Sequence, residues 1–241
     1  MNTNIERIKN FQLKDGEITA VEWLEKISQP NPNPLGIRFV EGGSFYRVTM
    51  KLHPTAKSNI TVMMYLPEPK MWNGKFMGTG NGGSAGNIGE AALINGVGRG
   101  YATANTDLGT TPDPDDCIGI HEIWTDYGHR ATHLMTVVGK QLTNYFYGKA
   151  PVYSYFVGGS TGGQQALAEA QRYPEDYDGI LCLSPAHDRV RLHSFFIWNW
   201  QQLHGRPDAT FTPGQAKKSR PSRKCCPCST WHFPRMQRPN R

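Results

Sequence analysis

One serine, placed where a strand pattern gives way to a helix pattern, constrains the fold of this chain more than any other feature. Residues 152–157 are β-branched and aromatic, as is typical of a buried strand, and residues 164–171 are good helix formers. Ser160 stands between them, with Gly158 and Gly162 two positions to either side. The pattern therefore predicts a sharp strand-to-helix turn centred on Ser160.

A turn of this kind exposes a serine as a nucleophile. The strained backbone lifts Oγ clear of the sheet, and the glycines prevent a Cβ from colliding with the neighbouring strand or helix. The next backbone N–H, at Thr161, points toward the place where a tetrahedral oxyanion forms. We therefore predict Ser160 as the nucleophile and Thr161 as an oxyanion donor; the alternative is a glycine-rich turn that only packs tightly or binds phosphate.

A second oxyanion donor is predicted in the glycine-rich stretch at residues 78–86, which follows a short strand at 75–78. Small residues let the backbone come within hydrogen-bonding distance of a substrate oxygen. Gly82 or Gly83 is the candidate donor. The alternative is a flexible surface loop without a ligand.

Strand and helix patterns alternate through much of the chain, which predicts an α/β fold with a doubly wound, mostly parallel sheet. Further strands are expected at 17–23, 45–52, 60–66, 101–106 and 180–183, and a long helix at 125–144. Asp107 follows one of these strands directly. We expect it to accept hydrogen bonds from loop N–H groups rather than to take part in catalysis.

Three stretches of sequence resemble the tannase and feruloyl esterase family of serine hydrolases. They are GGSTGGQ followed by AEAQRYPEDYDGI, WNGKFMGTGNGGSAG at residues 72–86, and RGYATANTD at residues 99–107. The resemblance extends from about Lys14 to about Gln215. It implies an α/β-hydrolase core with a large lid insertion, and hydrolysis of gallic or hydroxycinnamic (feruloyl) esters by a Ser-Asp-His triad.

The chain departs from the family pattern in two ways. Many members carry a disulfide-bonded cysteine immediately before the nucleophile, where this chain has Gly159, so it resembles the cysteine-free branch. The family's lid, acid and histidine also lie far downstream of the serine. We therefore expect residues 1–213 to be a partial α/β-hydrolase domain, truncated before the lid and the last strands, and the copy to be an inactive member of an esterase lineage.

A substitute triad is conceivable within the chain. Asp188 follows the strand after the nucleophile strand, a place where some related folds carry the triad acid. It would need His193 or His204 as the base, since the order serine, acid, histidine must be kept.

No cofactor or metal is expected. His129 and His133 lie four residues apart on one helix face, but the glutamate of the H-E-x-x-H pattern is absent, so we interpret both as packed or surface histidines. The predicted partner is a small aromatic ester; neither nucleic acid nor a membrane is an expected partner.

Residues 214–241 differ sharply in composition from the rest of the chain. They hold eight basic residues and no acidic one, although the whole chain carries a net charge of only +6. Four prolines and three cysteines accompany them, without any periodicity, which predicts disorder. Our leading interpretation is translation in a wrong frame after about Gln215; the alternatives are a basic arm on a non-enzymatic core that binds an anionic partner, and a metal site formed by Cys225, Cys228 and His232.

The amino terminus has no secretory pattern. Residues 1–11 are polar and charged, and no apolar run approaches the roughly 20 residues that a membrane span needs. Outside the basic segment only Cys117 and Cys182 remain, too few to suggest a disulfide scaffold. The expected location is cytoplasmic.

Overall fold

The structure, a computed structural model, describes residues 3–25, 28–29, 40–41, 43–111, 113 and 117–204. The chain forms two units, Met1–Asp188 and Arg189–Arg241. The first contains the sheet and the second contributes one helix, α6 (Arg189–His204). The basic segment 214–241, with its proposed disorder and metal ligands, lies outside the described residues.

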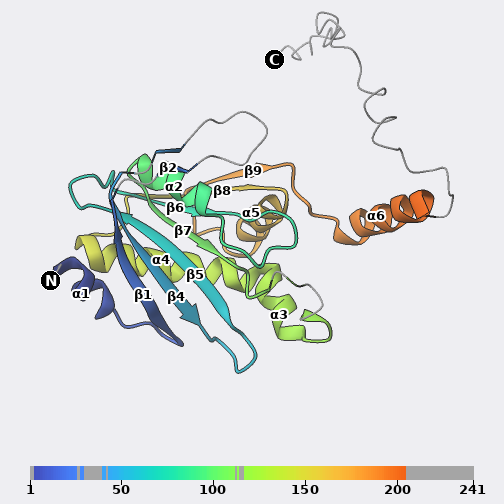
Figure 1. Ribbon diagram of the computed structural model, residues 1–241, viewed down its shortest axis with the longest axis horizontal. Helices are drawn as coiled ribbons and strands as arrows, with labels where there is room; N and C mark the ends of the chain where they lie inside the picture. Colours follow the sequence, from blue (N-terminus) through green and yellow to red (C-terminus); the bar gives the residue numbers. More distant parts are fainter. Residues whose placement is uncertain are drawn as a thin grey trace, which may run out of the picture. The chain divides into compact units, whose positions relative to one another are not determined.

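The first unit is built on a seven-stranded sheet (Figure 1). Its strands are β1 (Gly16–Leu24), β4 (Phe45–Leu52), β5 (Ile60–Pro67), β6 (Lys75–Thr79), β7 (Ala102–Thr106), β8 (Tyr153–Gly159) and β9 (Gly179–Leu183). They are ordered β1-β4-β5-β7-β6-β8-β9 across the sheet. A separate two-stranded ribbon pairs β2 (Ser28–Gln29) with β3 (Val40–Glu41).

The α/β class is confirmed and the sheet is mixed, with β1 and β5 running opposite to the other five strands. β1, β4, β5 and β7 pair with one another in antiparallel fashion, and only the pairings among β7, β6, β8 and β9 are parallel. The antiparallel pairing of β4 with β5 follows from their connection, which is the short loop 53–59. A parallel pair needs a crossover of about a dozen residues or more, usually with a helix.

Helices cover both faces of this sheet. They are α1 (Thr3–Lys9), α2 (Glu90–Gly98), α3 (His121–Thr125), α4 (Ala131–Tyr147) and α5 (Thr161–Arg172). On α2, Gly96 packs against Thr103 of β7, whereas on α4, Gly139 packs against the next residue, Ala104. Successive strand residues point to opposite faces. Therefore α2 and α4 lie on opposite sides of the sheet, and α5, which contacts α4, β8 and β9, shares the side of α4.

Two hydrophobic clusters correspond to these two faces. The larger contains Phe76, Met135 and Phe156 and lies beneath α4. The smaller joins Phe45 and Tyr65, whose rings stack with centroids 4.4 Å apart, to the buried side of α2. The parallel pairing of β6 with β8 places the carboxyl ends of these two strands beside each other.

The predicted helix at 125–144 is longer than expected and contains a wider turn. α3 continues into a π-helical turn, Asp126–Arg130, before α4 begins. Arg130 Nε donates a 2.5 Å hydrogen bond to the buried carboxylate of Asp126, and its Nη2 lies 2.6 Å from Glu122 Oε2. These ion pairs hold the irregular turn in place.

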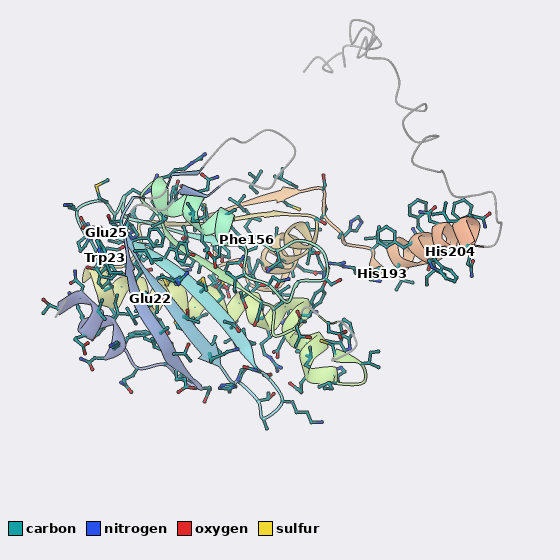
Figure 2. All side chains as sticks on the ribbon, in the orientation of Figure 1. Glu22, Trp23, Glu25, Phe156, His193 and His204 are labelled. Carbon is teal, nitrogen blue, oxygen red and sulfur yellow. The ribbon has the colours of Figure 1, made fainter. Side chains whose placement is uncertain are left out.

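The helix α6 of the second unit is rich in aromatic residues. Its large aromatic side chains are exposed within that unit; they include Phe195, Phe196, Trp198 and Trp200. Figure 2 labels His193 near its beginning and His204 at its end. Of the helices that the structure describes, none is both long enough and apolar enough to span a bilayer.

Candidate active site

Ser160 lies at the turn between β8 and α5, as predicted. β8 ends at Gly159, α5 begins at Thr161, and Ser160 has φ 58° and ψ −116°. A side chain in this backbone region is strained, and such strain is characteristic of functional sites. Ser160 is exposed and its hydroxyl makes no capping bond to α5, so Oγ is accessible for chemistry.

The turn is held by backbone hydrogen bonds to the end of β9 and to the segment after it. The N–H of Ser160 donates to the carbonyl of Leu183 at 3.0 Å. The carbonyl of Ser160 accepts from Ala186 at 2.9 Å and from Gln164 at 3.1 Å. The strained conformation is therefore fixed from both sides by main-chain groups and needs no support from its own side chain.

Three glycines let β8, α5 and the loop after β6 meet. A Cβ added to Gly158 would lie 2.1 Å from the carbonyl oxygen of Gly162, and one added to Gly162 would lie 2.9 Å from Cα of Gly80. A Cβ on Gly80 would lie 2.4 Å from Cα of Gly162. The predicted reason for the flanking glycines is confirmed. Gly80 was not singled out, although it lies in the same glycine-rich stretch.

Asn81 anchors the loop after β6, and sequence reasoning missed it. Its N–H donates to Gln165 Oε1 at 2.8 Å, and its carbonyl accepts from Gly162 N at 2.8 Å. Its side-chain amide donates to the carbonyls of Asn87 and Thr106 at 2.9 and 2.8 Å. The Asn81 N–H is thus unavailable to a substrate, and the next N–H groups along the loop are those of Gly82 and Gly83.

Gly82 and Gly83 border open space. A Cβ on either would meet no atom within 4 Å, and Gly83 has a positive φ of 59°. Within the part of the chain that the structure describes, neither N–H donates to another residue. The hydroxyl of Thr161 donates to the carbonyl of Gly83, so this loop is joined to the residue after the nucleophile. Their role as oxyanion donors stays a prediction.

Asp107 caps a loop, as expected. Its Oδ1 accepts the N–H of Thr61 at 2.9 Å and that of Gly109 at 2.8 Å. Burial raises the pKa of this carboxyl above its usual range, although the two N–H donors act in the opposite direction. The donors hold Asp107 on the β5 side of β7, in a structural role.

The residues considered for a substitute triad belong to different units. Asp188 ends the first unit, whereas His193 and His204 lie on α6 in the second. Within that unit the ring of His193 lies 6.1 Å from that of Phe196, and His204 Nδ1 lies 2.9 Å from the carbonyl oxygen of Trp200. A part for these residues in the reaction stays a prediction.

His129 and His133 are packed against other side chains, in agreement with the sequence interpretation. His129 Nδ1 lies 2.8 Å from Tyr173 Oη. The ring of His133 stacks on Tyr173 at 3.8 Å, and its Nδ1 lies 2.6 Å from Asp176 Oδ2. Burial, followed by the nearby charge of Arg172, lowers the pKa of His129, which favours its neutral form.

A buried carboxyl pair adjoins His133 and had no signal in the sequence. Ligand-type atoms of His133, Glu169 and Asp176 lie within 4.8 Å of one another. Glu169 is fully buried, and among the described residues no donor reaches either of its oxygens. Burial, with Asp176 second, raises the pKa of Glu169 to about 9. The arrangement fits a protonated Glu169 beside Asp176, whose Oδ2 lies 2.6 Å from His133 Nδ1.

One hollow in the described surface lies apart from Ser160. It has a volume of about 580 Å³ and is lined by β6, α2, β8 and β9, including Tyr101 and Tyr155. None of Ser160, Thr161, Gly82 or Gly83 lines it. The nucleophile turn is therefore exposed at the carboxyl end of β8 and does not form the floor of this hollow.

Comparison with known proteins gives consistent results. The tannase and feruloyl esterase family matches residues 46–225, which continues past Gln215. Probable feruloyl esterase B of Aspergillus niger is 38% identical over 165 residues, covering 67% of this chain and 31% of that protein. A probable feruloyl esterase of Arthroderma benhamiae is 40% identical over 148 residues and is covered to 27%. The chain thus spans about a third of the length of these curated relatives.

Solved structures show the same relationship. An esterase from Aspergillus oryzae superposes with a TM-score of 0.70 at 30% identity, covering 79% of this chain and 40% of that one. Feruloyl esterase B from the same organism gives a TM-score of 0.69 at 27% identity, with 80% and 39% covered. With the family match spanning most of the chain and the glycine-framed serine turn in place, this chain belongs to the tannase and feruloyl esterase family.

Proposed function

We propose that the chain carries the nucleophile and oxyanion donors of a serine carboxylesterase of the α/β-hydrolase type. The observation that supports this most strongly is the backbone of Ser160, which is strained, exposed and fixed by hydrogen bonds to Leu183 and Ala186. Strain of this kind persists only where the surrounding structure fixes it. A turn that served packing alone would gain nothing from it.

In the proposed reaction, Ser160 Oγ attacks the carbonyl carbon of an ester. The resulting oxyanion accepts hydrogen bonds from the N–H of Thr161 and from that of Gly82 or Gly83. The alcohol leaves, and water then releases the acid from the acyl-enzyme. Asn81 supports this geometry because its bonds to Gln165 and Gly162 hold the loop against α5.

The proposed substrates are esters of aromatic acids, of the gallate or hydroxycinnamate class. The support is the family match together with the names of the relatives, which are feruloyl esterases. The chain spans only part of those proteins, and the proposal extends their class of substrate to it.

The test is hydrolysis of methyl ferulate and methyl gallate by the purified chain. Ser160→Ala should abolish any release of acid, because no other group forms the acyl-enzyme. Ser184→Ala is the matched control, since Ser184 is also an exposed serine and directly follows β9. Equal release by wild type and Ser160→Ala would refute the proposal.

A further inference from the structure

The carboxyl-terminal end of α5 brings together three side chains of the kinds that bind metal ions. We propose that His133, Glu169 and Asp176 form a binding site for a divalent transition-metal cation of the zinc type. Ligand-type atoms of all three lie within 4.8 Å of one another. The site is separate from the nucleophile turn, because Glu169 lies about 14 Å along α5 from Ser160 at a helical rise of about 1.5 Å per residue.

The surroundings of Glu169 are the observation that points to a cation. Its side chain is fully buried, and among the described residues no donor reaches either of its two carboxyl oxygens. Buried polar groups are nearly always paired, so a carboxyl group without any partner requires an explanation. A proton on one oxygen, donated to Asp176, satisfies that oxygen and leaves the other without a donor. A cation bound by both oxygens satisfies the whole carboxylate.

The other two donors are held in position by groups that do not bind the ion. His133 Nδ1 lies 2.6 Å from Asp176 Oδ2, and the His133 ring stacks on Tyr173 at 3.8 Å. Lys140 Nζ donates to the carbonyl oxygen of Asp176 at 2.6 Å, and the Asp176 N–H donates to the carbonyl of Tyr173 at 2.9 Å. Supporting contacts of this kind orient metal ligands before the ion binds.

The donor set selects the kind of cation. An imidazole nitrogen with carboxylate oxygens suits zinc and similar divalent transition metals, whereas calcium and magnesium prefer oxygen ligands alone. Two carboxylates balance the charge of the ion, and Glu169 lies in the last turn of α5, where the helix dipole favours a cation. Donors at about 2.0–2.2 Å from zinc lie roughly 3.5 Å apart, so each of the three side chains needs to move by about 1 Å or less.

Binding of the cation is balanced in protons. His133 Nδ1 coordinates the ion with its lone pair, so the proton of the neutral ring moves to Nε2, and Glu169 releases the proton that it holds in the metal-free chain to the solvent. His133 is partly exposed, which gives the ion a route to the buried carboxylates. The sequence has no spacing pattern for this site, because its ligands come from α4, α5 and the loop before β9.

Isothermal titration of Zn²⁺ into the full chain, stripped of metal with EDTA, tests the site. Every sample, wild type included, carries serine in place of the three cysteines of the basic segment, because thiolates bind zinc on their own; these are Cys225, Cys226 and Cys228. We expect one equivalent of Zn²⁺ to bind. Glu169→Gln and His133→Gln should each weaken binding by about 100-fold or more, since loss of even an outer partner of a ligand costs about 10–100-fold.

Two matched controls change neighbouring residues of the same kinds. Glu175→Gln alters an exposed glutamate beside Asp176, and His129→Gln alters the histidine one turn before His133. Both variants should bind Zn²⁺ within about twofold of wild type. An equal loss of binding in these controls would show that the effect is not specific to the proposed ligands and would overturn the site.

Thermal unfolding separates metal binding from a purely structural role of Glu169. Zn²⁺ should raise the Tm of wild type and leave that of Glu169→Gln unchanged, whereas a structural role would lower the Tm of the metal-free variant without removing the rise. Wild type that binds no Zn²⁺, or equal binding by wild type and Glu169→Gln, would overturn the site. If Glu169→Gln or His133→Gln does not fold, Asp176→Asn, which keeps the shape of the ligand, decides by the same two measurements. Ser160 takes no part in them, so the proposed function stands or falls separately.

Discussion

The two ends of α5 are fixed by different kinds of interaction. At the amino-terminal end, Gly162 meets Gly80 and Gly158 through direct backbone contact beside Ser160. At the carboxyl-terminal end, Glu169 and Asp176 lie within 4.8 Å of His133, and these are side chains with ionisable groups. The amino-terminal end therefore requires residues without a side chain, whereas the carboxyl-terminal end depends on the protonation state of its ionisable groups.

The largest expected effect comes from a substitution that breaks the backbone contact at the amino-terminal end of α5. Gly158→Ala places a Cβ against the carbonyl of Gly162, which cannot move without displacing α5. We expect the free energy of unfolding to fall by more than about 3 kcal/mol, or the chain not to fold. Gly82→Ala is the control, since its Cβ would meet open space, and it should change stability by less than about 1 kcal/mol. Similar stabilities in urea titrations of the two variants would contradict the contact.

The other end of α5 should respond to pH. The pKa of Glu169 is raised to about 9 in the folded chain, so the folded state keeps a proton that the unfolded state releases. Stability contributed by this group is therefore full below about pH 4.5, its ordinary value, and is lost as the pH rises toward 9. Glu169→Gln should flatten this decline, measured as the free energy of unfolding at several pH values.

Glu175→Gln provides the control for that measurement, because Glu175 is an exposed glutamate close to Asp176 in the sequence. It should keep the wild-type decline. A Glu169→Gln variant with an unchanged decline would show that Glu169 is ionised in the folded chain.

Asp107 is a second, partly buried carboxyl group to compare with Glu169. Unlike Glu169, it accepts hydrogen bonds from backbone N–H groups. Asp107→Ala leaves the N–H groups of Thr61 and Gly109 without their acceptor, and we expect a loss of about 1–3 kcal/mol in thermal or urea unfolding. Asp107→Asn keeps an acceptor oxygen and should lose less. An equal loss in the two variants would mean that charge, and not hydrogen bonding, is what matters there.

The smallest expected effect concerns strain at Ser160. Glycine adopts the observed φ of 58° without a Cβ penalty, so Ser160→Gly should stabilise the chain by about 1 kcal/mol or less. Ser160→Ala keeps the Cβ and should not gain stability in this way. A clear loss of stability in Ser160→Gly would indicate that the turn is not strained.

The difference between the two ends of α5 also explains which features the sequence could predict. Ser160 and its flanking glycines are near one another in the chain, so the local pattern was enough to place the turn and the strand before it. The bond between Asn81 and Gln165 joins residues 84 positions apart, and that between His133 and Asp176 joins residues 43 apart. Neither pair has a local pattern, because their partners are set by the packing of whole elements.

The mixed sheet was missed for a related reason. Alternation of strands and helices predicts parallel pairing, but β4 and β5 follow one another without a helix, and the short loop 53–59 decides their direction. The local strand patterns at 45–52 and 60–66 were correct. These local patterns do not contain the order of the strands across the sheet.

The central claim is that the turn between β8 and α5 presents a nucleophilic serine. Peptide mapping of the fluorophosphonate-treated chain by mass spectrometry tests it most directly. We predict a single adduct on Ser160, in the peptide that continues into α5, and none in Ser160→Ala. An adduct on another serine such as Ser184, or equal labelling of Ser160→Ala, would contradict the claim.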